Sequence, residues 1–310
     1  MKKIFIDGSA GTTGLRIRER LAARADIELL TLPEEKRKDS AARKEMLNAA
    51  DAVFLCLPDD AAREAVAMIE NPDTVVLDTS TAHRTLDGWC YGFPELSTER
   101  AEAVKTAKRI AVPGCHASGF IALVYPLIRE AILPADAVLT CTSLTGYSGG
   151  GKKMIAQYET DEIDELLAAP RQYGLTQQHK HLKEMRAVTG LANAPAFLPI
   201  VADFYSGMEV TIPLFSHQLV DGKTVEDIKA VYAKYYTTPL LSYAESVDEE
   251  GFLSAAALSG KDSMQVSVHG NDERILLVAR YDNLGKGASG AAIECLNMVL
   301  GVEAYLGLEL

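Results

Sequence analysis

Residues 3–14 read KIFIDGSAGTTG, an apolar run followed by three glycines with two residues between each pair. The apolar run predicts a buried strand, and the spacing of apolar residues over 15–21 predicts a helix. A glycine-rich turn in this place lets backbone amides approach a pyrophosphate, whose negative charge the helix N-terminus favours. The stretch therefore predicts the start of a βαβ unit and a dinucleotide-binding loop made of Gly8, Ser9, Ala10, Gly11, Thr12, Thr13 and Gly14.

The glycine spacing departs from the usual G-x-G-x-x-G, so a simple tight turn is the alternative to a cofactor loop. An NAD-selective site commonly carries an acidic residue about 20 residues further on, which binds the ribose 2′-hydroxyl. Here the second predicted strand, residues 27–32, is followed by Pro33 and the charged run EEKRK over 34–38. Basic side chains there would pair with a 2′-phosphate, whereas a solvated charge run is the alternative. We predict NADP(H) as the cofactor, with Lys36 and Arg37 at the phosphate.

The remainder of the first third of the chain alternates between strand and helix patterns. Strands are expected over residues 27–32, 52–57 and 74–77, and helices over 41–49 and 61–69. This alternation predicts an α/β fold with a Rossmann-like doubly wound parallel sheet.

A second domain of the α+β class is predicted beyond the first third, because strand-like runs at 137–144, 209–215 and 264–268 alternate with polar and helical stretches. The segment 286–300 is expected to form a helix that packs back on the first domain. We therefore predict a discontinuous dinucleotide-binding domain, residues 1–115 and 286–310, and a catalytic and oligomerisation domain, residues 116–285.

Composition excludes several classes of protein. A length of 310 residues suffices for two domains, and 48% hydrophobic with 24% charged residues is ordinary for a globular protein rather than a disordered one. The net charge of −12 opposes binding to nucleic acid. No apolar run reaches the ~18 residues of a membrane span, and residues 1–6 enter a strand rather than a signal peptide. We expect a cytoplasmic protein with no nucleic-acid or membrane partner.

The five cysteines have no CxxC spacing, so neither a disulfide framework nor a zinc site is indicated. Cys56 and Cys141 lie in strand-like runs, where packing explains them. Cys115 differs, because it follows Pro113-Gly114 in the stretch VPGCHASG, which is typical of a turn leading into a helix. A helix N-terminus stabilises a thiolate, and a thiolate is both a good nucleophile and a good leaving group. We predict that Cys115 is the catalytic nucleophile; a structural cysteine at a turn is the alternative.

The stretch QQHKHLKE, residues 177–184, supplies two of the six histidines in a polar context. Histidine is the usual general acid or base near neutral pH, so His179 and His181 are candidates for that role. On a helix the two side chains would diverge, and on a strand they would share a face. The sequence therefore does not choose between them, and because spacing places no third ligand we predict no metal.

Two further segments are candidates for binding anions. Residues 78–84, DTSTAHR, follow a predicted strand and end in Arg84, whose guanidinium could clamp a phosphate or a carboxylate. The glycine-rich stretch YSGGGKK, residues 147–153, resembles a binding loop and carries Lys152 and Lys153. Exposed, solvated cations are the alternative in both places.

Together these motifs resemble the N-acetyl-gamma-glutamyl-phosphate reductase family, in its shorter form, within the group that contains aspartate-semialdehyde dehydrogenase. The resemblance covers nearly the whole chain and rests on residues 8–14, 78–84, 89–95, 113–115, 179–184 and 283–290. The longer form of the family reads P-G-C-[FY]-x-T-G at the nucleophile, where this chain has His116 and Ser118. Its H-R-H-x-P-E motif is present here as HKHLKE.

The resemblance implies NADPH-dependent reduction of N-acetyl-L-glutamyl 5-phosphate to the semialdehyde, with release of phosphate, in arginine biosynthesis. It implies that Cys115 attacks the acyl phosphate, that hydride reduces the resulting thioester, and that His179 or His181 handles the protons. The expected partners are the acyl-phosphate substrate, phosphate and further copies of the chain in a homodimer or homotetramer.

The resemblance also implies further site residues. Cofactor contacts are expected from Ser80, Asn283, Gly285 and Lys286, and substrate contacts from Arg84, His116, Ser148, Gly149, Lys152 and Glu184.

The rival functions are an aspartate-semialdehyde dehydrogenase or a related lysine-pathway reductase, a non-catalytic NADP-binding sensor, and a Cys–His hydrolase without a cofactor. The hydrolase would leave the glycine loop unexplained.

Overall fold

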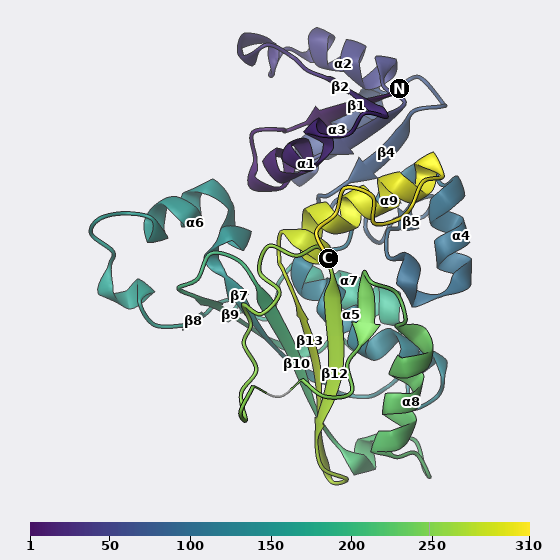
Figure 1. Ribbon diagram of the computed structural model, residues 1–310, viewed down its shortest axis with the longest axis vertical. Helices are drawn as coiled ribbons and strands as arrows, with labels where there is room; N and C mark the ends of the chain where they lie inside the picture. The colour runs from purple at the N-terminus through teal and green to yellow at the C-terminus, as the bar shows by residue number, and fades with distance from the viewer. Residues whose placement is uncertain (248) are drawn as a thin grey trace. The chain divides into compact units, whose positions relative to one another are not determined.

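The computed structural model describes residues 1–247 and 249–310 and divides the chain into two compact units (Figure 1). The first unit holds residues 1–114 and 288–308, and the second holds 115–287 and 309–310. The boundaries expected from sequence differ by one residue at the first junction (115 against 114) and by two at the second (286 against 288). The structure also assigns the last two residues to the second unit.

The first unit is built on a six-stranded sheet in the order β2-β1-β3-β4-β6-β5. Every neighbouring pair is parallel, as the alternation of strands and helices predicts. The strands are β1 (Lys2–Asp7), β2 (Ile27–Leu30), β3 (Ala52–Leu55), β4 (Val75–Asp78), β5 (Cys90–Tyr91) and β6 (Arg109–Ala111). The Rossmann-like fold class is confirmed.

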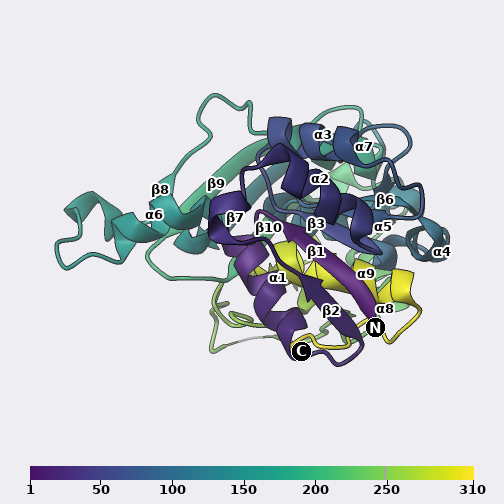
Figure 2. The same cartoon turned by 90° about the horizontal axis from the view of Figure 1, so that it is seen from above.

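Helices cover both faces of this sheet, because successive side chains of a buried strand point to opposite sides. Ile4 and Ile6 of β1 face one apolar cluster, and Phe5 faces the other. The first cluster includes residues from α1 (Thr12–Ala22), α4 (Thr98–Thr106) and α9 (Gly290–Leu300); the second includes residues from α2 (Ser40–Ala49) and α3 (Asp59–Met68). Figure 2 shows α2 and α3 on one side of β1 and β3, with α1 on the other. The C-terminal helix α9 therefore packs on the first unit, as expected.

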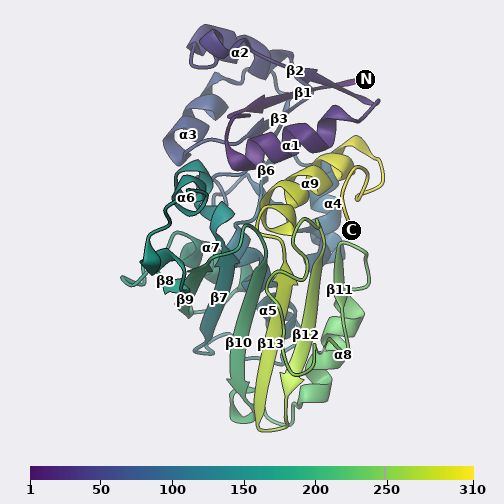
Figure 3. The same ribbon diagram turned by 60° about the vertical axis from the view of Figure 1, so that its left-hand side comes forward.

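The second unit contains a seven-stranded mixed sheet in the order β11-β12-β13-β10-β7-β9-β8 (Figure 3). The three strands expected from sequence are present as β7 (Thr140–Gly146), β10 (Met208–Phe215) and β12 (Met264–Gly270). The others are β8 (Arg171–Gln172), β9 (Ala196–Ala202), β11 (Leu241–Tyr243) and β13 (Arg274–Tyr281). The pairs β7–β9 and β11–β12 are parallel, and the remaining pairs are antiparallel.

One face of the second sheet packs against helices. The helix α5 (Cys115–Arg129) contacts β10 and β13 and is buried from residue 116 to residue 127. The helices α7 (His181–Thr189) and α8 (Val225–Tyr235) contact α5, and α6 (Gly151–Tyr158) follows the glycine-rich loop after β7. Burial of a helix on nearly all sides explains why α5 is almost entirely apolar.

Short turns of helix complete the described chain. The 3₁₀ turns are η1 (Glu34–Lys36), η2 (Pro94–Leu96), η3 (Tyr147–Gly150), η4 (Glu165–Leu167) and η5 (Ser216–Gln218), and a π-helical turn, η6, spans Gly285–Ser289. Within the described residues, the structure contains no helix with the length and apolar character needed to cross a membrane.

Candidate active site

Cys115 is the first residue of α5, and the turn formed by Pro113 and Gly114 leads into it. Its side chain is half-buried, whereas the rest of the first turn of α5 is fully buried. The positive end of the helix dipole favours an anionic sulfur at this position. All five cysteines are free rather than paired in disulfides, so no disulfide blocks the sulfur of Cys115.

A tyrosine in the sheet holds the start of α5 in place. The Tyr281 hydroxyl donates to the Cys115 carbonyl oxygen at 2.6 Å and accepts from the Gly119 amide at 3.1 Å. This approach requires a glycine, because a Cβ at Gly119 would lie 2.7 Å from the Tyr281 oxygen and 2.7 Å from a methyl carbon of Val210. The glycine that ends the VPGCHASG stretch therefore has a packing role that sequence reasoning did not assign.

His179 and His181 lie together although the sequence left their relation open. His179 occupies the turn before α7, and His181 is the first residue of that helix. Their rings are 4.8 Å apart, edge to face, and each ring lies 5.6 Å from the ring of His116. The turn is neither a regular helix nor a strand, so both side chains reach one cluster. Among the described residues, no group of three or more metal-ligating side chains is arranged to hold a metal ion.

The backbone of α7 sets the tautomer of His179. The His181 amide donates to Nδ1 of His179 at 3.3 Å, so in the neutral ring the proton is on Nε2. Burial, followed by the charge of Lys180, lowers the pKa of His179. The loop is pinned to β9, because the Gln177 amide both donates to the Phe197 carbonyl at 2.7 Å and accepts from its N–H at 2.8 Å.

His116 is fully buried, and both of its ring nitrogens have protein partners. Nδ1 lies 2.7 Å from Oγ of Ser143 on β7, and Nε2 lies 2.6 Å from the hydroxyl of Tyr173. Burial, followed by the charge of His179, lowers the pKa of His116 to about 3. The imidazole is therefore neutral at physiological pH.

Sequence reasoning missed Tyr173 and Ser143. Tyr173 follows β8, and its amide donates to the Pro199 carbonyl of β9 at 3.0 Å. Burial, followed by the charge of Cys115, raises the pKa of the Tyr173 phenol. No motif marks either residue, since only folding brings them to His116.

The glycine-rich loop after β7 is tied to the segment that follows β13. The Asn283 side chain donates to Oγ of Ser148 at 3.0 Å and accepts from the Gly207 amide at 2.9 Å. A Cβ at Gly149 would lie 3.3 Å from the Asn283 amide nitrogen. The structure thus brings together Ser148, Gly149 and Asn283, whereas Lys152 is exposed on α6.

Asp282 organises the turn that carries Gly285 and Lys286. One carboxylate oxygen accepts from the Leu284 amide at 2.7 Å and from the Gly285 amide at 2.9 Å. The other accepts from Oγ of Ser206 at 2.7 Å and from the Gly260 amide at 2.6 Å. Asp282 is fully buried, and sequence reasoning missed it. Lys286 is buried in the same turn, and Glu184 is buried on α7.

In the first unit, the loop 8–14 closes tightly on itself and on β3. Gly8 has φ +90°, and a Cβ there would lie 2.2 Å from the Cys56 carbonyl oxygen. A Cβ at Gly14 would lie 2.5 Å from the Gly8 carbonyl oxygen. Gly11 is the N-cap of α1, which has no side-chain cap and no acidic residue in its first turn. An uncapped, uncharged helix N-terminus after a glycine turn fits a pyrophosphate.

The basic run beyond β2 lies in and after η1. Lys36 is exposed, and Arg37 is half-buried and forms an ion pair with Glu34. Asp7, at the end of β1, forms a buried ion pair with Arg43 of α2, with 2.8 Å between Oδ2 and Nη2. The pairing of Lys36 or Arg37 with a 2′-phosphate stays a prediction.

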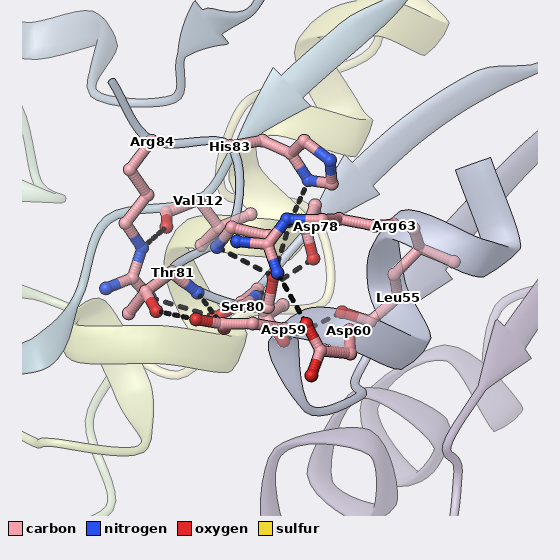
Figure 4. Close-up of polar contacts among 12 residues, drawn as sticks. Leu55, Asp59, Asp60, Arg63, Asp78, Ser80, Thr81, His83, Arg84 and Val112 are labelled. Atoms are coloured by element: carbon pink, nitrogen blue, oxygen red, sulfur yellow. Dashed lines mark hydrogen bonds and ion pairs between the residues drawn. The ribbon is translucent and has the colours of Figure 1, made fainter. Parts of the chain in front are cut away.

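The segment after β4 is held by two carboxylates (Figure 4). Asp78 accepts from the amide and the hydroxyl of Ser80, at 2.9 and 2.7 Å, and lies 2.6 Å from Nδ1 of His83. Asp59 accepts from the amide and the hydroxyl of Thr81. The ring of His83 also stacks on Trp89 at 4.1 Å. Ser80, the predicted cofactor contact, is therefore rigidly held at the carboxyl end of a parallel strand, where ligands of such sheets bind.

Arg84, the predicted anion clamp, is buried in the same segment. Its Nε donates to the Val112 carbonyl and its Nη2 to the Thr79 carbonyl, both at 2.9 Å (Figure 4). These bonds fix the segment after β4 to the segment that precedes Cys115 in the chain. Contact between Arg84 and a substrate anion stays a prediction.

Comparison with known proteins identifies the family. Residues 3–104 match a model described as the NAD binding domain of semialdehyde dehydrogenase, and residues 115–283 match one described as its dimerisation domain. Two N-acetyl-gamma-glutamyl-phosphate reductases, from a Nostoc species and a Chelativorans species, are 46% and 47% identical to this chain. The alignments cover 99% of both chains for the first, and 96% of this chain and 98% of the relative for the second. The chain belongs to the N-acetyl-gamma-glutamyl-phosphate reductase family.

Membership in this reductase family makes the protein an oxidoreductase and confirms the resemblance found in its motifs. Comparison with solved structures supports the fold alone. An aspartate semialdehyde dehydrogenase II from Vibrio cholerae has a TM-score of 0.74 at 14% identity, covering 97% of this chain and 98% of that one. An aspartate semialdehyde dehydrogenase with NADP from Candida albicans has a TM-score of 0.67 at 16% identity, covering 97% and 99%. The aspartate enzymes therefore share the architecture of the reductase family.

Proposed function

We propose that the protein reduces N-acetyl-γ-glutamyl phosphate to the corresponding semialdehyde with NADPH and releases phosphate, as a step of arginine biosynthesis. The main support for this proposal is the half-buried Cys115 thiol at the start of α5, in the unit that contains the His179 and His181 cluster. The relatives that are 46–47% identical to this chain are named N-acetyl-gamma-glutamyl-phosphate reductase.

In the proposed reaction Cys115 forms the covalent intermediate. The sulfur attacks the acyl carbon, an S–C bond forms, the C–O bond to phosphate breaks, and phosphate leaves with the electron pair. Because Nδ1 of His179 already accepts from a backbone amide, its Nε2–H is left to donate to the substrate. We therefore assign proton donation to His179 and removal of the Cys115 proton to His181.

The proposed cofactor contacts fall into two groups of residues. In the first, the loop Gly8–Gly14 would hold the pyrophosphate, Lys36 and Arg37 the 2′-phosphate, and Ser80 a further polar group. In the second, Asn283, Gly285 and Lys286 are the proposed contacts, on the turn that Asp282 organises. When bound, the nicotinamide supplies the hydride that reduces the thioester.

The proposed substrate contacts are anion-binding and polar groups. Ser148 and Gly149 lie on the loop that Asn283 holds, and Glu184 is buried on the helix that begins at His181. Arg84 and Lys152 are the proposed cations for phosphate or carboxylate.

The proposal is tested by running the reaction in reverse. With NADP⁺ and phosphate, we expect turnover of N-acetylglutamate semialdehyde with kcat/KM at least about 100-fold above that for aspartate semialdehyde, because the smaller substrate leaves the acyl-binding groups unused. NADPH formation is followed by absorbance. Preference for aspartate semialdehyde or for a longer acyl chain would replace the substrate. NADPH binding without turnover would indicate a sensor, and acyl-phosphate hydrolysis without NADPH binding would indicate a hydrolase.

We also propose that the protein forms a homodimer through the sheet face opposite α5. The residues of β13 alternate, so that Tyr281 faces α5 while Leu276 lies on the other face, 40% exposed. Phe215 of β10 is 53% exposed, and the matched family model is a dimerisation domain. Exposed apolar side chains on a sheet face are typical of an interface.

A charge placed on this face should dissociate the dimer. Leu276→Asp is expected to lower the mass measured by light scattering at micromolar concentration to that of one chain, because an interface buries an unpaired carboxylate at high cost. The matched control is Leu15→Asp on α1, at a leucine that is 44% exposed in the first unit. A monomeric wild-type protein, or equal dissociation in both variants, would contradict the proposed interface.

A further inference from the structure

His116 has no polar atom left for a ligand, so a role at the active site must pass through a neighbour. Its side chain is buried, and its two ring nitrogens are bonded to Ser143 and Tyr173 at 2.7 and 2.6 Å. It directly follows Cys115 on α5, and adjacent helical residues do not face each other. The groups through which His116 can act are the two hydroxyls that it joins, those of Ser143 and Tyr173.

A neutral imidazole between two hydroxyls has one donor and one acceptor to offer. In one tautomer, Nδ1–H donates to Ser143 and the Tyr173 hydroxyl donates to Nε2, which uses up the phenol hydrogen. In the other, the Ser143 hydroxyl donates to Nδ1 and Nε2–H donates to the Tyr173 oxygen. Only the second tautomer leaves the Tyr173 hydrogen available to a third group.

The surroundings favour a role for that hydrogen. The pKa of the Tyr173 phenol is raised, so the hydroxyl keeps its proton, and the Cys115 charge contributes to the shift. Ser143 is completely buried on β7, and rings of His179, His181 and Phe197 enclose His116. A chain of hydrogen bonds in such an enclosed place has fixed directions and little competition from water.

We infer that His116 is a positioning residue that acts through Tyr173: the chain Ser143–His116–Tyr173 directs the phenol hydrogen of Tyr173 to the oxygen of the acyl group carried by Cys115. This inference rests on the proposed function, which makes Cys115 the acyl carrier. When the carbonyl carbon is reduced, the electron pair of its π bond moves to that oxygen, and the Tyr173 hydrogen bond stabilises the charge there. No net proton movement along the chain is required.

Two substitutions of His116 separate the bonds on its two sides. In His116→Asn the amide occupies the place of Nδ1 and can keep the bond to Ser143, whereas the bond to Tyr173 is lost. In His116→Gln the longer amide reaches the place of Nε2 and can keep the bond to Tyr173. Tyr173→Phe removes the hydroxyl itself while preserving the ring.

The variants should fall in a defined order. Tyr173→Phe is expected to lower kcat about 100-fold with KM changed by less than about 3-fold, as for removal of one oxyanion donor. The kcat of His116→Asn should lie within about 3-fold of the kcat of Tyr173→Phe. The kcat of His116→Gln should be lower than the wild-type kcat by less than about 10-fold. The double variant His116→Asn/Tyr173→Phe should be no slower than Tyr173→Phe alone, because both changes remove the same bond.

The inference would be overturned by wild-type kcat in His116→Asn, by multiplying losses in the double variant, or by equal loss in His116→Gln and His116→Asn. Thermal melting and stoichiometric alkylation of Cys115 by iodoacetamide establish that each variant is folded with its nucleophile intact. If His116→Asn does not fold, Ser143→Ala serves instead, with an expected loss of about 10-fold in kcat, and unchanged kcat there overturns the inference. Failure of the proposed function is distinct, since the wild-type protein would then not turn over the N-acetylglutamyl substrate at all.

Discussion

Cys115→Ser is expected to lower kcat for semialdehyde formation by at least about 1,000-fold, because a serine hydroxyl is far less ionised at neutral pH and leaves poorly from an acyl intermediate. The change removes only the sulfur at the first residue of α5, so the fold and the glycine loop of the other unit are preserved. NADPH oxidation measures the loss, and fluorescence titration should give an unchanged dissociation constant for NADPH.

Cys90→Ser is the matched control, since Cys90 is also half-buried but lies on β5 in the first unit. Burial raises the pKa of its thiol, which is the opposite of what a nucleophile needs. Its kcat should stay within about 3-fold of the wild-type value, as for a substitution away from the reacting atoms. Retained turnover in Cys115→Ser, or an equal loss in Cys90→Ser, would remove Cys115 from the mechanism.

Strands β1 to β4 of the parallel sheet could be predicted because their signals are local, whereas β5 and β6, with two and three residues, are too short to give a recognisable pattern and were missed. Strands buried on both faces are continuous apolar runs, and each is followed within a short distance by a helical pattern. The second sheet was predicted only in part. Its strand β9 contains Pro199, which removes a ladder N–H and weakens the strand pattern, and its short strands β8 and β11 have two and three residues.

The residues of the candidate site likewise divide into those that a local sequence signal marks and those that it does not. Cys115 is marked by a local turn signal, whereas Ser143, Tyr173 and Tyr281 act on α5 from 27, 57 and 166 residues away along the chain. No local pattern encodes such contacts. The relation of His179 to His181 depends on a turn whose backbone is fixed by Gln177 and β9, so neither helical nor strand spacing described it.

Burial explains why two predicted substrate contacts, Arg84 and His116, already have protein partners, although whether either contacts substrate stays a prediction. Sequence reasoning treated Arg84 and His116 as groups that face a ligand. In the structure both are buried, and buried polar groups find protein partners: backbone carbonyls for Arg84, and hydroxyls for His116. A residue type indicates what chemistry is available, and only its surroundings show whether that chemistry is already used.

Gly8→Ala is expected to destabilise the first unit by about 2–5 kcal/mol, since alanine is strained at positive φ and overpacks a tight contact. The backbone at Gly8 has φ +90°, and the added methyl would lie 2.2 Å from the Cys56 carbonyl oxygen of the neighbouring strand segment. Neither backbone atom can move without disturbing β1 or β3. Urea denaturation followed by circular dichroism measures the change, and NADPH binding should be lost along with the loop.

Gly11→Ala separates the two roles of the loop, which are to stabilise the fold and to bind the cofactor. Gly11 has φ −72°, and a Cβ there would meet only the Gly8 carbonyl oxygen at 3.5 Å, an ordinary contact. Stability should therefore change by less than about 1 kcal/mol, the usual cost of alanine at a helix N-cap. If a pyrophosphate rests on these amides, the methyl obstructs it, and the dissociation constant for NADPH should rise about 10-fold or more. Equal destabilisation in both variants would contradict the geometry of the turn, whereas unchanged NADPH affinity in a stable Gly11→Ala protein would move the cofactor away from this loop.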